Sequence, residues 1–347
     1  MTARIRRNPQ KTSPAPSQHP TREPIYSTPP SVESPAASNN PTHAKIYIPQ
    51  EGMQEIASAS VEMLTSTSLV PLRDLIVKAR KQKAQVTSDL KEARDEEARQ
   101  KGELNHRRRS IFRWFYKKRI AELEEALPVT QGEIERLKNW EGNTKIAVTF
   151  VAEEAAQRAY SSMVRAFDSL TRSRKKWDIT ADRSTNQFAE RTLANRAVDR
   201  YLVTFEFSSS DLIEFSGRAM RFENINGDDI LIYPGVAVIP RADGVFALID
   251  IRELNIDIKG VQFHETEDVP NDTEVVGYTW AKTNKDGSPD RRFKENYQIP
   301  ICLFGQIAFC SQTGVTEEYM VSNIKAALAF VEAVRVYQTA LAQSDMQ

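Results

Sequence analysis

The chain has 347 residues, of which 40% are hydrophobic and 27% charged, enough for more than one folded unit. Lys+Arg and Asp+Glu both total 47, so no global charge drives binding to nucleic acid or membrane. No run approaches the roughly 18 apolar residues of a transmembrane helix, and the basic N-terminus has no apolar stretch behind it, which argues against a secretory signal. Two cysteines, Cys302 and Cys310, are too few for a disulfide framework. We therefore expect a soluble cytoplasmic protein.

Residues 1–45 hold nine of the 17 prolines, together with many Ser, Thr and Asn residues and almost no large apolar side chains. Such a segment cannot bury enough apolar surface to offset its chain entropy. No two of its prolines stand three apart, so the PxxP signature is missing. The composition predicts a disordered Pro/Ser-rich tail that acts as a tether.

Residues 46–141 are predicted to form a helical hairpin or coiled coil. The heptad pattern runs from Leu69 to Leu127, where Pro128 is expected to end the first helix. A capping-box pattern at Thr130–Glu133 then predicts the start of an antiparallel partner helix. Polar residues interrupt the apolar seam at Lys83, Glu97 and Gln100. The apolar positions are Leu69, Leu72, Ile76, Ala79, Val86, Leu90, Ala93, Leu104, Ile111 and Phe115.

Residues 142–210 are predicted to form a small βααβ unit. Lys145–Val151 and Tyr201–Phe207 alternate apolar and polar residues as strands do, and we expect them to pair. Ala152–Ser173 is predicted to be a helix and Trp177–Arg200 a weaker helical stretch. The buried face of the first of these helices is predicted to carry Ala156, Ala159, Met163, Phe167 and Leu170.

Residues 211–347 are predicted to form an antiparallel β domain closed by a terminal helix. Short strand patterns separated by turn signals fill most of this region. Ser322 is expected to cap the closing helix, which carries Val331 on its apolar face. This order of elements is that of a pleckstrin-homology-like (PH-like) barrel. The predicted strands are Ile230–Ile239, Val245–Asp250, Leu254–Phe263, Val275–Ala281, Gln298–Phe304, Ile307–Ser311 and Glu317–Val321. The fold class expected for the whole chain is α+β.

Five stretches carry a resemblance: Ile111–Glu124, Leu231–Gly235, Phe246–Asp250, Val276–Trp280 and Asn284–Pro300. On these stretches most of residues 70–340 resembles uncharacterised bacterial proteins in which a coiled-coil-rich front precedes a PH-like β domain. The run Asn284–Pro300 is the most specific of the five. The resemblance implies that fold and brings no function with it, although similar motifs accompany bacterial restriction-type proteins.

The strongest local charge lies in residues 106–119, which hold seven Lys or Arg residues, several aromatic rings and no acid. Arginines can pair with phosphate, and aromatic rings can stack on bases or enter a bilayer interface. The favoured alternative is structural: Ile111, Phe112 and Phe115 form hairpin core near the tip, and the charges are simply solvated. The candidate binding residues are Arg107, Arg108, Arg109, Arg113, Trp114, Lys117, Lys118 and Arg119.

A second candidate lies in Asn284–Pro300, where Asp286-Gly287 and Ser288-Pro289 predict turns. Its cations could hold an anionic ligand, but neighbouring acids nearly neutralise them. We therefore favour an architectural loop, held by internal salt bridges and anchored by Phe293 and Tyr297. The candidate binding residues here are Arg291, Arg292 and Lys294.

Catalytic signatures are weak. Asp250 and Asp257–Lys259 mimic the acid-x-Lys strand of metal-dependent restriction enzymes, but the spacing is short and no upstream acidic partner is evident. The four histidines do not cluster, and no cofactor or metal motif is present. The sequence thus favours a non-enzymatic scaffold of the bacterial cytoplasm, with a protein partner or self-association. The alternative is a nucleic-acid-binding accessory subunit of a phage-defence or restriction-type system that uses residues 106–119, and a membrane surface ranks behind both.

Overall fold

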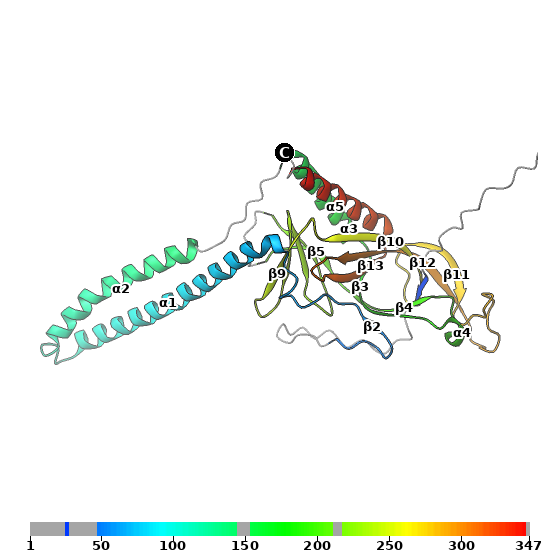
Figure 1. The fold of residues 1–347 in the computed structure, drawn as a ribbon. Helices are drawn as coiled ribbons and strands as arrows, with labels where there is room; N and C mark the ends of the chain where they lie inside the picture. The colour runs from blue at the N-terminus through cyan, green and yellow to red at the C-terminus, as the bar shows by residue number, and fades with distance from the viewer. Residues whose placement is uncertain (1–24, 28–46, 144–152, 211–216, 345–347) are drawn as a thin grey trace, which may run out of the picture.

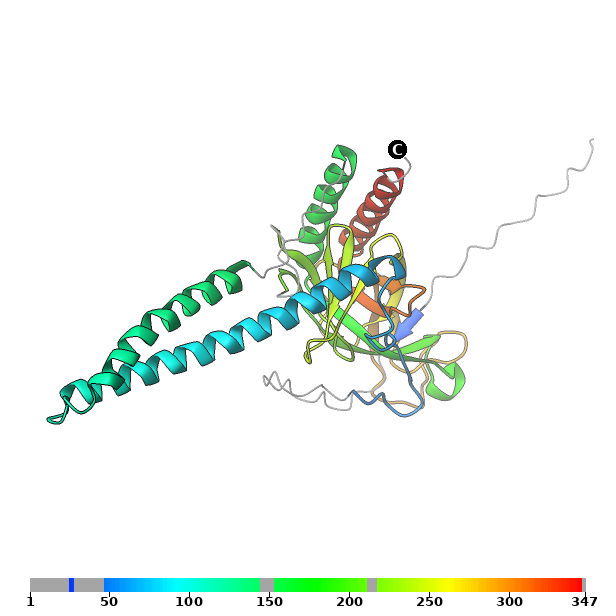
Figure 2. The ribbon, with the colours of Figure 1, turned by 60° about the vertical axis from the view of Figure 1, so that its left-hand side comes forward.

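The computed structural model describes residues 25–27, 47–143, 153–210 and 217–344. Helices α1 (Val70–Arg109) and α2 (Lys117–Asn143) form a hairpin that extends away from a body of strands and shorter helices (Figure 1). The turned view in Figure 2 shows the same separation. The fold is mixed helix and antiparallel sheet, and the predicted helical hairpin is confirmed.

An apolar layer holds the two arms of the hairpin together. Val86 and Leu90 of α1 pack with Ile134 and Leu137 of α2, and all four side chains are buried. The polar interruptions of the seam are satisfied across the hairpin: Thr130 Oγ1 lies 3.1 Å from Gln100 Oε1, and Gln131 Nε2 donates to Glu97 Oε1 at 2.9 Å. Lys83 is exposed.

The turn of the hairpin lies at Ser110–Tyr116, between α1 and α2, and its predicted position at Pro128 is wrong. Pro128 lies inside α2. Thr130 therefore caps no helix, and its hydroxyl oxygen lies 3.3 Å from the carbonyl oxygen of Ala126 one turn back. A proline costs a helix one backbone hydrogen bond. The packing of α1 against α2 offsets this loss, so α2 continues past Pro128.

The strands form two sheets. The larger has the order β10-β1-β4-β3-β13-β12-β11, with β2 on β3 and a further pairing of β10 with β12, and the smaller has the order β5-β6-β7-β8-β9. The larger sheet contains β1 (Ile25–Ser27), β2 (Gln54–Glu55), β3 (Lys176–Ser184), β4 (Arg196–Leu202), β10 (Asn255–His264), β11 (Glu274–Trp280), β12 (Gln298–Cys310) and β13 (Thr316–Val321). The smaller contains β5 (Phe205–Ser208), β6 (Ala219–Phe222), β7 (Ile230–Tyr233), β8 (Val236–Pro240) and β9 (Phe246–Asp250).

Helix α3 (Glu154–Thr171) packs along α5 (Ile324–Ser344), as Figures 1 and 2 both show. All five residues predicted for the buried face of α3 are buried. The ring of Phe167 from this face contacts Phe207, Phe222 and Phe330. The main core therefore lies where α3, α5 and the strands meet.

The base of the hairpin is anchored on the smaller sheet. Ile76 of α1 is fully buried against a cluster that includes Leu231, Val238 and Leu248, on β7, β8 and β9. Arg80 Nη1 donates to the carbonyl of Gly244 at 2.6 Å. The first turns of α1 thus attach the hairpin to the body.

Several predicted elements differ in the structure. Most of Trp177–Arg200, predicted as helical, forms the strands β3 and β4 around the one-turn helix α4 (Gln187–Glu190). The predicted strand Ile230–Ile239 is interrupted at Gly235, whose φ of 74° makes a turn. The two strands predicted at Gln298–Phe304 and Ile307–Ser311 are one long strand, β12. The strand predicted at Lys145–Val151 lies outside the described residues.

The predicted tail over residues 1–45 also lies outside the described residues, except for the strand β1. Residues 47–69, which were predicted as part of the hairpin, lie against the body: Val61 and Leu64 join the main core. The domain boundary predicted at 210/211 separates strands that pair with each other. Strand β3 lies before this boundary and β13 after it, and their pairing sets Tyr319 opposite Asp178.

Candidate functional site

The first candidate is the tip loop, which we define as Ser110–Tyr116. Successive turns shape it: Arg113 N–H donates to Ser110 O at 3.1 Å, and Phe115 N–H donates to Phe112 O at 3.0 Å. The side-chain hydroxyl of Ser110 accepts from Phe112 N–H at 3.2 Å. Local hydrogen bonds therefore fix the backbone of the loop without a contribution from its apolar side chains.

The apolar side chains of the tip loop are exposed. Ile111 is 85% exposed, Phe112 55%, Trp114 60% and Phe115 65%. The rings of Trp114 and Phe115 stack on each other, with centroids 3.6 Å apart. The favoured prediction, that Ile111, Phe112 and Phe115 form hairpin core, is wrong. The physical reason is the position of the turn, because the chain reverses here and no third element of the described structure covers these side chains.

The basic residues around the tip loop fall into two groups. In the first, Arg107 and Arg119 both pair with Glu103, and Arg108 pairs with Glu124. Hydrogen bonds from Arg119 and Arg107 lower the pKa of Glu103. The charges of this first group are largely neutralised within the hairpin.

The second group consists of Arg109, Arg113, Lys117 and Lys118, whose side chains make no ion pair with any described residue. Arg109 ends α1, Arg113 lies in the loop, and the two lysines open α2. The structure thus divides the predicted basic segment into paired flanks and a tip with free cations.

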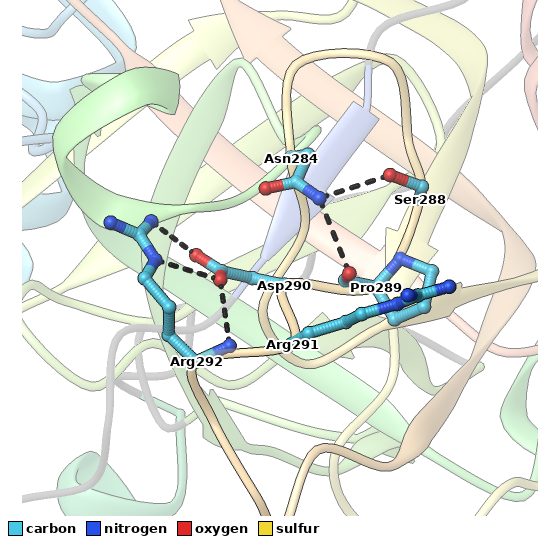
Figure 3. A pocket seen from close by; sticks show the side chains of 6 residues that line it. All are labelled: Asn284, Ser288, Pro289, Asp290, Arg291 and Arg292. Atoms are coloured by element: carbon cyan, nitrogen blue, oxygen red, sulfur yellow. Dashed lines mark hydrogen bonds and ion pairs between the residues drawn. The ribbon is translucent and has the colours of Figure 1, made fainter.

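The second candidate, the loop of residues 284–300, surrounds an open hollow of about 400 Å³ lined by Asn284, Ser288, Pro289, Asp290, Arg291 and Arg292 (Figure 3). Gly287 has a φ of 82°, and Asp286 Oδ1 accepts from the backbone N–H of Ser288 at 3.1 Å, so the predicted turn is confirmed. Asn284 Nδ2 crosses the loop to Ser288 Oγ at 3.0 Å and to Pro289 O at 3.2 Å. These contacts serve the loop itself.

A buried carboxylate organises the same loop. Asp290 accepts from the backbone N–H of Arg292 at 3.1 Å and from its guanidinium Nε at 2.9 Å, and Arg191 Nε lies 3.9 Å away. The hydrogen bonds from Arg292 lower the pKa of Asp290 to about 2. The predicted internal salt bridge is confirmed for Arg292.

Other parts of the loop prediction are wrong. Arg291 and Lys294 make no ion pair with a described residue. Phe293 is 44% exposed and Tyr297 60%, so neither ring is buried as an anchor. The two candidate sites also lie at opposite ends of the molecule, the tip loop at the far end of the hairpin and the 284–300 loop beyond β11 (Figure 1).

Two buried polar clusters were missed by sequence reasoning. In the first, the guanidinium of Arg200 lies 4.3 Å from the ring of Trp177 and 4.2 Å from that of Phe263, and it pairs with Glu265 at 2.7 Å. Both charged side chains are almost completely buried. A charged residue among apolar strand residues needs a partner, so the sequence could have indicated that Arg200 and Glu265 are paired. It could not have indicated that they pair with each other.

The second cluster places two carboxyl groups between the sheets. Asp178 of β3 and Glu317 of β13 are both buried; Asp178 Oδ2 accepts from Ile225 N–H at 2.8 Å, and Glu317 Oε1 accepts from Ser58 N–H at 3.2 Å. Burial raises the pKa of Asp178 to about 8 and that of Glu317 to about 7. These groups are enclosed in the core of the protein.

The nuclease-like acids do not form a catalytic pair. Asp250 is held by Arg252 at 2.6 Å, and Asp257 pairs with Arg335 at 2.6 Å. Among the described residues no group of three or more His, Cys, Asp or Glu side chains could hold a metal ion. No helix in the same part of the chain is long and apolar enough to cross a membrane.

Comparison of the chain with family models, with curated proteins and with solved structures gives no match.

Proposed function

We propose that the protein is a non-enzymatic interaction protein in which the hairpin presents the tip loop to a partner and the β-rich body serves as the scaffold. The exposure of Ile111, Phe112, Trp114 and Phe115 carries this proposal. Exposed apolar side chains that cluster on a surface mark interaction sites, whereas single ones are ordinary. These four lie together on one short loop, remote from the body.

The competing function is nucleic-acid binding by an accessory subunit of a phage-defence or restriction-type system. It is favoured by Arg109, Arg113, Lys117 and Lys118, whose unpaired charges are available to phosphate. It is opposed by the glutamates that neutralise the arginines on the flanks of the hairpin. We place it second for that reason.

The test compares co-purification from the native cell for the tagged wild-type chain and the variant Ile111→Ser/Phe112→Ser. The expected result is that the variant loses specific partners, because it removes two of the four exposed apolar side chains that carry the proposal. Phe188→Ser is the control, since Phe188 of α4 is 74% exposed on the body. Retention of every partner by the tip variant contradicts the proposal.

The competing function has its own measurement, the salt dependence of DNA and RNA binding. Release of counterions from phosphate gives a steep fall of affinity with salt concentration. Apolar docking of the tip loop gives a shallow one. A steep slope that Lys117→Ala/Lys118→Ala flattens favours the accessory subunit.

The remaining predictions belong to this proposal. A PH-like barrel over 211–347 is supported by the succession of short antiparallel strands and the terminal helix. A coiled-coil character of the hairpin is supported by the layer of Val86, Leu90, Ile134 and Leu137 between its two arms.

A further inference from the structure

We propose that the tip loop binds the surface of a membrane that contains anionic phospholipids. This inference rests on the proposed function, because it names the partner of the same loop. Its evidence is the arrangement of apolar and cationic side chains around the turn of the hairpin.

The apolar side chains lie where a flat surface would meet the hairpin first. The tip loop is the end of a projection, and its side chains are exposed rather than gathered around a pocket. Trp and Tyr rings prefer the interface of a bilayer, and Phe and Ile prefer its acyl boundary. The loop contains Ile111, Phe112, Trp114, Phe115 and Tyr116, and thus both kinds of side chain.

The unpaired cations stand directly behind these side chains. Arg109 is the last residue of α1, and Lys117 and Lys118 are the first residues of α2. With a rise of about 1.5 Å per residue they lie within about 5 Å of the ends of the loop. Phosphate groups lie at a similar distance above the acyl boundary, where an interfacial segment is buried about 5–10 Å deep.

Helix stability does not explain the two lysines. Basic residues at the C-terminus of a helix, such as those at the end of α1, complement the helix dipole, but at the N-terminus they oppose it. The first turn of α2 has no acidic residue. Lys117 and Lys118 therefore occupy a position that the helix dipole disfavours, and no acidic residue in the first turn offsets this. An anionic surface would supply the missing negative charge.

The charge pattern along the hairpin favours a membrane over a nucleic acid. A nucleic acid that followed the flanks would meet Glu103, Glu122 and Glu124, which occupy the arginines there. A membrane touches the tip alone and leaves those glutamates in water. Ile111, the most exposed of the apolar side chains, has no ring to stack on a base, and Trp114 and Phe115 stack on each other.

The test is vesicle co-sedimentation of the full chain with phosphatidylcholine alone and with phosphatidylcholine that contains phosphatidylserine. The wild type is expected to bind only the anionic vesicles, and less tightly as salt rises. Lys117→Ala/Lys118→Ala should lower the partition coefficient about 30-fold, because each basic residue near an anionic surface contributes about 1 kcal/mol. Lys81→Ala/Lys83→Ala is the matched control, since both lysines are exposed on α1 near the body.

A second pair of variants tests insertion of the apolar side chains. Phe112→Ser/Phe115→Ser should lower binding at least about 10-fold through the lost apolar area. Phe188→Ser/Tyr278→Ser, which removes two exposed rings from the body, should leave binding unchanged. None of these side chains is buried, so the variants should fold as the wild type does.

Three outcomes overturn the proposal: no binding to anionic vesicles, equal binding to neutral ones, or equal losses in the control variants. Displacement of the protein from vesicles by a single-stranded oligonucleotide, with the same variants weakening both, also overturns it in favour of nucleic acid. If vesicles are not bound but the tip variants lose a protein partner in the native cell, the membrane proposal falls and the proposed function stands. If the tip variants lose neither, both fall.

Discussion

At the scale of single residues, the least ordinary groups are the buried carboxyl groups of Asp178 and Glu317. The negative charges of Glu317, Glu223 and Asp229 add to the effect of burial in raising the pKa of Asp178. Asp178 Oδ1 and Glu317 Oε2 have no hydrogen-bond partner in the described part of the chain. The protonated form of each group is favoured because it buries no charge.

We predict that stability falls as pH rises across this cluster. The folded pKa of Asp178 is raised from 3.8 to about 8, so its stabilising effect is complete below its unfolded value and is lost as pH rises through about 8. Asp178→Asn cannot ionise. It should flatten the pH dependence and raise the unfolding free energy at about pH 9 by on the order of 2 kcal/mol.

Denaturant unfolding at about pH 5 and about pH 9 measures this effect. Glu332→Gln is the control, because Glu332 is exposed on α5 and should leave the slope unchanged. Equal stability of the wild type at both pH values would show that the buried carboxyl groups do not titrate in this range.

Asp290 is predicted to matter more to the 284–300 loop than the aromatic residues do. Asp290→Ala removes the acceptor of three hydrogen bonds from Arg292, one of them from its backbone N–H. It should lower the melting temperature more than Arg292→Ala, which removes the two guanidinium bonds and keeps the backbone bond to Asp290. Phe293→Ala should cost less than about 1 kcal/mol, because the ring is half-exposed. Thermal unfolding of the three variants gives the ranking, and a larger loss for Phe293→Ala would contradict it.

At the scale of elements, Pro128 is a point of weakness in α2. It is exposed, it lies inside the helix, and it supplies no N–H to the carbonyl one turn back. Pro128→Ala should stabilise the hairpin, by at most about 3 kcal/mol, through a restored hydrogen bond and better helix propensity. Helical circular dichroism during thermal unfolding measures this. Ala121→Pro, an exposed position nearer the start of α2, should have the opposite effect.

The helices with regular apolar faces could be predicted from the sequence. The spacing of apolar residues in α3 identified its buried face, because one side of that helix faces core and the other faces solvent. The hairpin was predicted for the same reason, but not its turn. Pro128 is a strong stop signal on its own, whereas Ser110–Tyr116 contains neither glycine nor proline. Packing between the arms decided the outcome.

The strand β3 could not be predicted from periodicity. Its residues Trp177–Ala181 are all buried, so both faces are covered and alternation disappears. Two of them, Asp178 and Thr180, are polar, which lowers the apparent hydrophobicity of a buried strand. The cap of α5 shows a similar limit: Asn323 Oδ1 accepts from Ala326 N–H at 3.1 Å, while the predicted cap, Ser322, accepts from Lys175 N–H through its hydroxyl.

The candidate sites were located by composition, but their exposure was not predictable. Residues 106–119 carry the same charges and rings whether they lie within a helix or at a turn. The position of the turn alone determines whether the apolar side chains of this segment are covered by the other arm or exposed to solvent. That position depends on contacts between residues far apart, such as Thr130 with Gln100.

At the scale of the whole molecule, the body depends on segments from several parts of the chain. The ring of Phe167 in α3 touches Phe330 in α5, and β13 takes β3 as its neighbour. A fragment from Gly217 to Ser344 lacks both partners. We predict that this fragment will not unfold cooperatively. A sharp thermal transition of the fragment would contradict this.

Removal of the hairpin should have a far smaller effect. Thr87 Oγ1 lies 3.0 Å from Glu141 Oε1, so a short flexible linker can replace residues 88–140. The contacts of Ile76 and Arg80 with the body remain in this variant. Its melting temperature for the β-rich body should stay close to that of the wild type, and its radius of gyration in small-angle scattering should be clearly smaller.

The continuity of α1 has a mechanical consequence. About 15 Å of the helix, from Val70 to Arg80, is held against β7, β8 and β9, and about 44 Å extends beyond Arg80 to Arg109, at 1.5 Å per residue. A sideways force on the tip therefore acts as on a lever, with a ratio of about three between its long and short arms. A tip displacement of about 3 Å corresponds to about 1 Å at Val70 if the helix stays straight. Load applied at the tip is delivered as torque to the smaller sheet.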